Sequence, residues 1–156
     1  MMAAVMTQEQ SELSCVLIPL NAGNLLLPNV CVAEILLWRR IKSLAGAPDW
    51  CLGLLGWRGQ SIPVVRFESL NNSRSEERKT GRCMIVMNRS RSSDGLAFYA
   101  LAAHGLPRMV QLTDDDLSNE PGKLGPGEIV VVKLGTESAI IPNLDFIESN
   151  VRKLEL

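Results

Sequence analysis

Short apolar runs of strand length alternate along this chain with glycine, asparagine and charged residues. The clearest pair covers residues 52–57 and 61–67, with Arg58-Gly59-Gln60 between them. A glycine in so short a connection can take the positive φ of a tight turn. The pattern therefore predicts a central β-hairpin that exposes Arg58 at its tip.

Pro63 lies inside the second strand of this hairpin. Proline has no amide hydrogen to donate to a sheet ladder. The second strand is therefore expected to lie at a sheet edge, to start its pairing after Pro63, or to carry a bulge there.

Similar runs on both sides of the hairpin predict further strands, and each pair is separated by a turn signal. The expected strands are residues 13–20 with 25–27, 83–88 with 96–103, and 128–134 with 137–142. Residues 121–127 are expected to be a plain connection. Short strands with turns about every 8 to 12 residues indicate small barrels, in place of a parallel sheet with crossover helices. We expect a mostly β protein whose two lobes are similar, with an internal duplication.

Three segments have helical features. After Pro28, Val30, Ala33 and Leu37 keep helical spacing, with Asn29 as a candidate cap. The other two are "TDDDL" from residue 113, where acidic groups suit a helix start, and residues 143–151. The apolar side chains after Pro28 form either core or an interaction groove, and the pattern alone does not separate the two.

Length and charge exclude some classes of protein. At 156 residues the chain can bury roughly two-thirds of its unfolded surface without disulfides. A net charge of −1 disfavours nucleic-acid binding, which normally needs a basic excess. The polar stretch 71–82 carries charges of both signs without interleaved aromatic residues, so we expect a mobile, solvated loop.

Cysteine usage and the absence of targeting signals favour the cytoplasm. Cys15, Cys31, Cys51 and Cys83 are too widely spaced for a CxxC motif and lie in apolar runs, so they are expected to be buried free thiols. The first residues lack a secretory signal, and no apolar run reaches the roughly 18 residues of a membrane helix. No direct membrane insertion is expected.

No constellation of catalytic, cofactor-binding or metal-binding residues emerges from the sequence. His104 is the single histidine, and no GxSxG elbow is present. The glycines at 53, 56 and 59 do not match a dinucleotide fingerprint, and the aspartates at 114–116 lack calcium-loop spacing. A non-catalytic adaptor with exposed apolar edges is the simplest interpretation.

Two motifs resemble a known family. Val32, Glu34 and Ile35 fit V-x-E-I, and "LGLLGWRGQSIPVV" fits G-V-x-N-L-R-G-x-x-x-P-V, the hallmarks of the coupling protein CheW of bacterial chemosensory arrays. The resemblance spans residues 13–148. Gly56-Trp57 stands where the family has Asn-Leu, and Arg66 stands where an acid is expected.

The resemblance implies a fold and a domain organisation. The expected fold is two five-stranded barrels, similar to Src-homology barrels, packed around a shared apolar core, with a few short helices. The CheW-like domain would cover residues 13–149, between a flexible N-terminal arm, 1–12, and a C-terminal tail, 150–156.

The resemblance also implies a function in signal transduction. CheW-like proteins couple the cytoplasmic tips of methyl-accepting chemoreceptors to the regulatory domain of a CheA-type histidine kinase, in chemotaxis or in type IV pilus twitching motility. The location implied is the cytoplasm, at chemoreceptor arrays. The alternatives are a regulatory-domain-like module of a CheA kinase and a small-molecule-binding β-barrel protein.

Site residues follow from the motifs. Arg58 and Glu34 match the residues that the family links to partner binding, and Trp57 and Gly59 flank Arg58. Val30, Val32 and Ile35 are the expected lining of the receptor groove. We further expect Arg58 to contact a partner and not to form a structural ion pair.

Overall fold

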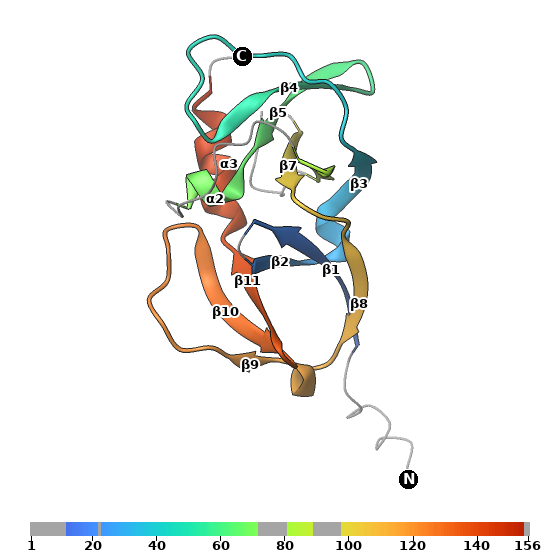
Figure 1. Cartoon of the computed structure of the whole chain (residues 1–156), viewed down its shortest axis with the longest axis vertical. Coiled ribbons are helices and arrows are strands. Elements are labelled where there is room, and N and C mark those ends of the chain that lie inside the picture. Colours follow the sequence, from blue (N-terminus) through green and yellow to red (C-terminus); the bar gives the residue numbers. More distant parts are fainter. Residues whose placement is uncertain (1–11, 22, 72–80, 89–97, 155–156) are drawn as a thin grey trace.

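The structure is a computed structural model that describes residues 12–21, 23–71, 81–88 and 98–154 (Figure 1). Residues 1–11 of the predicted arm, residues 72–80 of the predicted mobile loop, and residues 89–97 lie outside the described residues. The chain starts in one lobe, builds a second lobe, and returns to the first.

Lobe A is a six-stranded sheet with the order β8-β1-β2-β11-β10-β9. Its strands come from both ends of the chain: β1 Leu13–Leu20, β2 Gly23–Pro28, β8 Arg108–Leu112, β9 Ser118–Asn119, β10 Glu128–Leu134 and β11 Glu137–Pro142. The predicted hairpins β1–β2 and β10–β11 are confirmed as antiparallel pairs. The two-residue strand β9 gives this lobe one strand more than the five expected.

Lobe B is a five-stranded sheet with the order β3-β6-β7-β5-β4. Its strands are consecutive in the chain: β3 Val32–Leu37, β4 Cys51–Trp57, β5 Gln60–Val65, β6 Cys83–Met87 and β7 Tyr99–Ala103. In Figure 1 lobe B lies above lobe A. The expectation of a mostly β protein with two sheet lobes is therefore confirmed.

The central hairpin is β4–β5, with Trp57 paired to Gln60 across a two-residue turn. Pro63 faces Leu54 of β4, whereas the parallel pairing of β5 with β7 covers only Val64 and Val65. Of the three options for this proline, pairing that starts after it is the one observed, on the β7 side of the strand.

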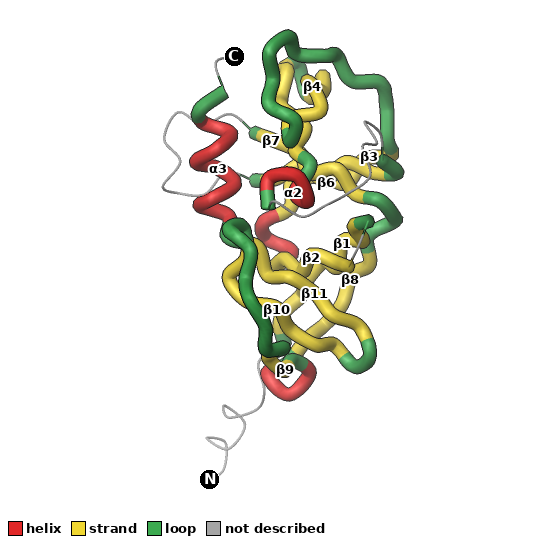
Figure 2. Tube along the Cα trace, turned by 60° about the vertical axis from the view of Figure 1, so that its left-hand side comes forward, coloured by secondary structure: helices red, strands yellow, loops and turns green. Residues whose placement is uncertain are grey.

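The helices are short. Helices α2, Phe67–Leu70, and α3, Leu144–Arg152, lie next to each other (Figure 2). The side chain of Asn143 caps α3 by accepting a hydrogen bond from the amide of Phe146 at 3.2 Å. The predicted start at Thr113 is only a 3₁₀ turn, Asp114–Asp116, in which the Asp116 carboxylate accepts from the Thr113 amide at 2.7 Å.

Two sequence predictions are wrong. The segment after Pro28 is a single 3₁₀ turn, Asn29–Cys31, without a side-chain cap, followed by strand β3 in place of a helix. The predicted tail also overlaps α3, which continues to Arg152, and Val151 is buried in the core. Strand β3 has apolar residues on both faces, and such a short run cannot be separated from a helix by periodicity.

Three apolar clusters form the core. One joins the two lobes, because it contains side chains of β1 and β2 from lobe A, of β5, β6 and β7 from lobe B, and of both helices. The second fills lobe B and the third fills lobe A. The lobes therefore share a core, as the family resemblance implied.

Candidate functional site

The candidate site begins at the turn between β4 and β5. Arg58 and Gly59 form this turn with φ values of 46° and 77°. Positive φ at both central residues is the geometry of a type I′ turn, which matches the twist of hairpin strands. Within the described residues, Arg58 is the only non-glycine residue with positive φ. The turn thus holds Arg58 in a conformation that most L-residues avoid.

Glu34 of β3 meets this turn from the opposite edge of lobe B. Its Oε1 accepts a hydrogen bond from Trp57 Nε1 at 2.9 Å, and Arg58 Nη2 lies 3.4 Å from the same oxygen. The guanidinium carbon of Arg58 lies 4.7 Å from the centre of the Trp57 ring. Because β3 and β4 are the outer strands of the sheet, this Glu34–Trp57–Arg58 cluster connects its two edges.

The members of the cluster differ in exposure. The side chain of Arg58 is 68% exposed and that of Glu34 is 39% exposed. Trp57 is only 5% exposed and packs on Phe98, with ring centroids 4.9 Å apart. The turn therefore presents a cation, as predicted, whereas the ring of the preceding Trp57 is buried. Gly59 is exposed and shapes the turn.

Arg58 also differs from the prediction in having an intramolecular partner. The pair with Glu34 is exposed to solvent, and exposed pairs contribute about 0 to 1 kcal/mol. The cation–π contact with Trp57 adds a similar amount at an exposed site, about 0.5–1 kcal/mol. These two contacts orient the Arg58 guanidinium. The guanidinium nevertheless stays exposed to solvent, so it is not part of a buried ion pair.

The apolar residues expected in the receptor groove do not behave alike. Val30 is 80% exposed and Ile35 is 42% exposed, whereas Val32 is partly buried and packs on the core shared by the lobes. Leu37, which the site prediction omitted, is 71% exposed. We call Ile35 and Leu37 of β3, together with Val30 of the preceding 3₁₀ turn, the β3 stripe. In a strand, side chains two positions apart lie on the same face. Interpreting this segment as a strand would therefore have placed Leu37 beside Ile35.

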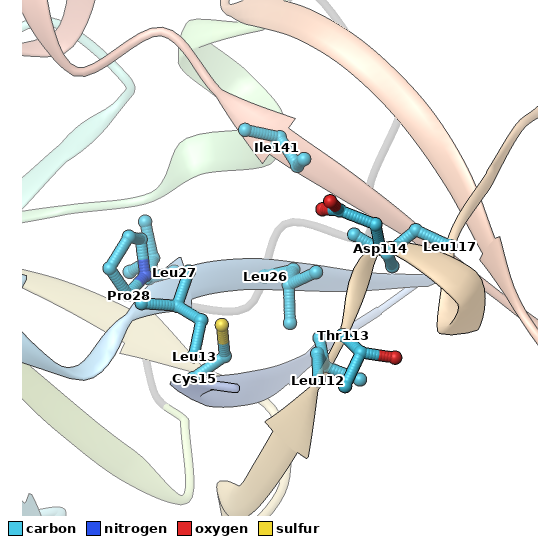
Figure 3. A pocket seen from close by; sticks show the side chains of 10 residues that line it. All are labelled: Leu13, Cys15, Leu26, Leu27, Pro28, Leu112, Thr113, Asp114, Leu117 and Ile141. Carbon is cyan, nitrogen blue, oxygen red and sulfur yellow. The ribbon is translucent and has the colours of Figure 1, made fainter. Parts of the chain in front are cut away.

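A separate apolar pocket lies in lobe A, and none of the residues predicted for the site lines it (Figure 3). Its volume is about 160 Å³. The lining combines apolar side chains with the thiol of Cys15 and the oxygens of Thr113 and Asp114 (Figure 3): Leu13, Cys15, Leu26, Leu27, Pro28, Leu112, Thr113, Asp114, Leu117 and Ile141.

The thiols are poor nucleophiles in this fold. Cys15, Cys51 and Cys83 are buried, Cys31 is partly buried, and all four are free, which confirms the predicted buried thiols for three of them. Burial raises the pKa of each thiol. Burial, with smaller contributions from Glu148 and Cys31, also raises the pKa of Tyr99 far above its usual value.

Other reactive groups do not gather in one place. His104 is exposed, and its amide donates to the Pro19 carbonyl at 2.9 Å. Among the described residues, no three His, Cys, Asp or Glu side chains could share a metal ion. No helix in the described ranges is long and apolar enough to cross a membrane.

Comparisons with known proteins show which family the chain belongs to. The CheW-like domain model matches residues 14–149. The crystal structure of the scaffolding protein TtCheW from Thermoanaerobacter tengcongensis superposes with a TM-score of 0.68 at 14% identity, over 85% of this chain and 89% of that one. No curated protein matches the sequence. The match over most of the chain confirms the resemblance seen in the motifs, and the chain belongs to the CheW-like domain family.

Proposed function

We propose that the protein is a non-catalytic adaptor that couples methyl-accepting chemoreceptors to a CheA-type histidine kinase. Its partners are the cytoplasmic tip of the receptor and the regulatory domain of the kinase, and its place is the cytoplasm, at receptor arrays. The output is chemotaxis or type IV pilus twitching motility, which use the same coupling step. The adaptor domain runs from residue 13 to the end of α3 at Arg152.

Family membership and one structural observation support this proposal. The observation is that the exposed side chains of Glu34 and Arg58 are held in a fixed orientation by a buried tryptophan. Arginine is one of the residues enriched among binding hot spots. Preorganisation of this kind also lowers the entropy cost of binding.

Roles can be assigned to each residue of the site. Arg58 and Glu34 contact the partners. Trp57 holds the side chains of Arg58 and Glu34 in place, and Gly59 shapes the turn that carries Arg58. Val30 and Ile35 face the receptor. Val32 supports the same strand from the core side.

The lobe A pocket is the observation that favours the small-molecule-binding alternative. Its volume of about 160 Å³ is below the roughly 300–1,000 Å³ of ordinary ligand sites. Its two residues with side-chain oxygens, Thr113 and Asp114, lie at the start of the short 3₁₀ turn. We therefore retain the adaptor as the conclusion.

The test is calorimetric titration of the protein with a receptor-tip fragment and with a kinase regulatory domain. Arg58→Asn is the informative variant, because asparagine tolerates the positive φ of the turn and removes the cation. We expect it to weaken binding to at least one partner by about tenfold or more, and to lower the melting midpoint by only a few degrees, because the exposed contacts of Arg58 are weak.

Arg108→Asn is the matched control. Arg108 is a second exposed arginine, 57% exposed and paired to Glu137 at 2.8 Å, but it lies in lobe A. The Arg108→Asn variant should bind both partners as the wild type does. Wild-type protein that binds neither partner would refute the adaptor function.

A further inference from the structure

Three arginines lie next to the ends of two paired strands. Arg39 and Arg40 follow β3, and Arg82 directly precedes β6. All three are exposed, and their side chains make no hydrogen bond or ion pair within the described part of the chain. Arg58 and Arg108, in contrast, each face a carboxylate. We call the three arginines the basic patch.

Backbone contacts bring the members of the patch together. The amide of Trp38 donates to the carbonyl of Arg82 at 2.9 Å, which places Arg82 beside the residue that precedes Arg39. Gly81 lies against the Trp38 ring, where an added Cβ would come within 3.2 Å of a ring carbon. Three cations are therefore held on adjacent backbone segments.

The basic patch also continues the β3 stripe. Leu36 and Trp38 pack toward the interior of lobe B, whereas Ile35, Leu37 and Arg39 are exposed. Residues two positions apart share a face of an extended chain. The exposed face thus changes from apolar to cationic where β3 ends.

We propose that the receptor surface bound by the β3 stripe carries carboxylates that face Arg39, Arg40 and Arg82. The protein would then select chemoreceptors that have an acidic segment next to an apolar one. This inference rests on the proposed function and adds the chemistry of the receptor. Arginine suits the role, because its planar guanidinium binds carboxylates with two parallel hydrogen bonds.

The surroundings favour a local electrostatic contact with a protein. The whole chain has a net charge of −1, so long-range attraction to acidic partners can arise only from local patches. Three arginines beside exposed apolar residues fit the rim and centre of a protein interface.

The test measures association rates with a receptor-tip fragment. The patch variant Arg39→Glu/Arg40→Glu is compared with Lys123→Glu/Lys133→Glu, which reverses two exposed lysines elsewhere and changes the net charge equally. At about 50 mM salt the patch variant should associate about tenfold more slowly or worse, and the control within about twofold of wild type. At about 500 mM salt the three proteins should converge, because screening removes steering.

Each other outcome has a clear meaning. Equal slowing of both variants would overturn the inference, and so would wild-type association that does not fall with salt. Binding of the wild type, but not the patch variant, to vesicles that contain phosphatidylserine, with unchanged receptor association, would assign the patch to membranes and overturn it too. Wild-type protein that fails to bind the receptor tip at any salt would instead refute the proposed function.

Discussion

A single oxygen of Glu34 serves two donors, the indole of Trp57 and the guanidinium of Arg58. The two contacts differ in environment, because Trp57 is buried and Arg58 is exposed. Losing the acceptor of a buried N–H costs about 1–3 kcal/mol, whereas losing an exposed ion pair costs at most about 1 kcal/mol.

Two substitutions at Glu34 separate these costs. Glu34→Gln keeps an oxygen for the indole and should lower the free energy of unfolding by at most about 1 kcal/mol. Glu34→Leu removes the acceptor and should cost about 1–3 kcal/mol. Urea unfolding followed by tryptophan fluorescence measures both. Equal losses for the two variants would mean that the indole hydrogen bond contributes nothing to stability.

The buried thiols predict a dependence of stability on pH. Burial raises the pKa of Cys15, Cys51 and Cys83 in the folded state. Above about pH 8.5 the unfolded chain loses thiol protons that the folded chain keeps, so the unfolded state is favoured as pH rises. The melting temperature should therefore fall between pH 8 and pH 10, with Tyr99 adding to the fall at the upper end. Triple replacement of these cysteines by alanine should flatten the profile, and an unchanged slope would contradict this cause.

At the scale of the element, strand β3 carries both core and surface residues. Val32 packs on the shared core, while Ile35 is 42% exposed. Ile35→Asp should therefore leave the melting midpoint nearly unchanged and weaken receptor binding by about tenfold or more. Val32→Asp should destabilise the fold by several kcal/mol, because it places a carboxylate against apolar side chains. Thermal melts beside receptor titrations measure both, and an unfolded Ile35→Asp would return this face to the core.

The hairpins could be predicted from the sequence because strand runs and turn residues are local signals. The β4–β5 turn followed from Gly59 between two apolar runs, and α3 followed from its spacing after Asn143. Strand β3 was predicted as a helix, because an edge strand with one face on the core and an apolar outer face has no clear period of two. The resemblance to V-x-E-I identified Glu34 despite this error.

Contacts between distant segments could not be predicted in the same way. The hydrogen bond from Trp57 to Glu34 joins residues 23 positions apart, and nothing local in either segment indicates it. The burial of Trp57 follows from that contact and from Phe98. The sequence therefore indicated the residues of the candidate site, but not which of them reach the surface.

At the scale of the whole molecule, a buried asparagine joins the lobes. Asn71, which is 3% exposed, follows α2, and its Nδ2 donates to Glu128 Oε2 at 2.6 Å while its Oδ1 accepts from the Gly127 amide at 2.8 Å. A Cβ at Gly125 would lie 2.6 Å from the same Oδ1. The segment expected to be a plain connection is thus packed against the lobe junction.

The shared core and this asparagine predict that the lobes unfold together. All three tryptophans, Trp38, Trp50 and Trp57, lie in lobe B or in the segment between β3 and β4, so their fluorescence reports that lobe. Far-ultraviolet circular dichroism reports the strands of both lobes. The two unfolding curves in urea should coincide, which is the mark of one cooperative transition. A separate, earlier transition by either probe would show that the lobes are independent.

A bridging measurement tests whether this protein connects the receptor tip to the kinase regulatory domain. A receptor-tip fragment is immobilised, and a labelled kinase regulatory domain is passed over it with and without the protein. We expect retention of the kinase domain to rise when the protein is present, to fall with Arg58→Asn and to be unaffected by Arg108→Asn. Kinase retention that is the same with and without the protein, although the protein binds each partner alone, would rule out the coupling role.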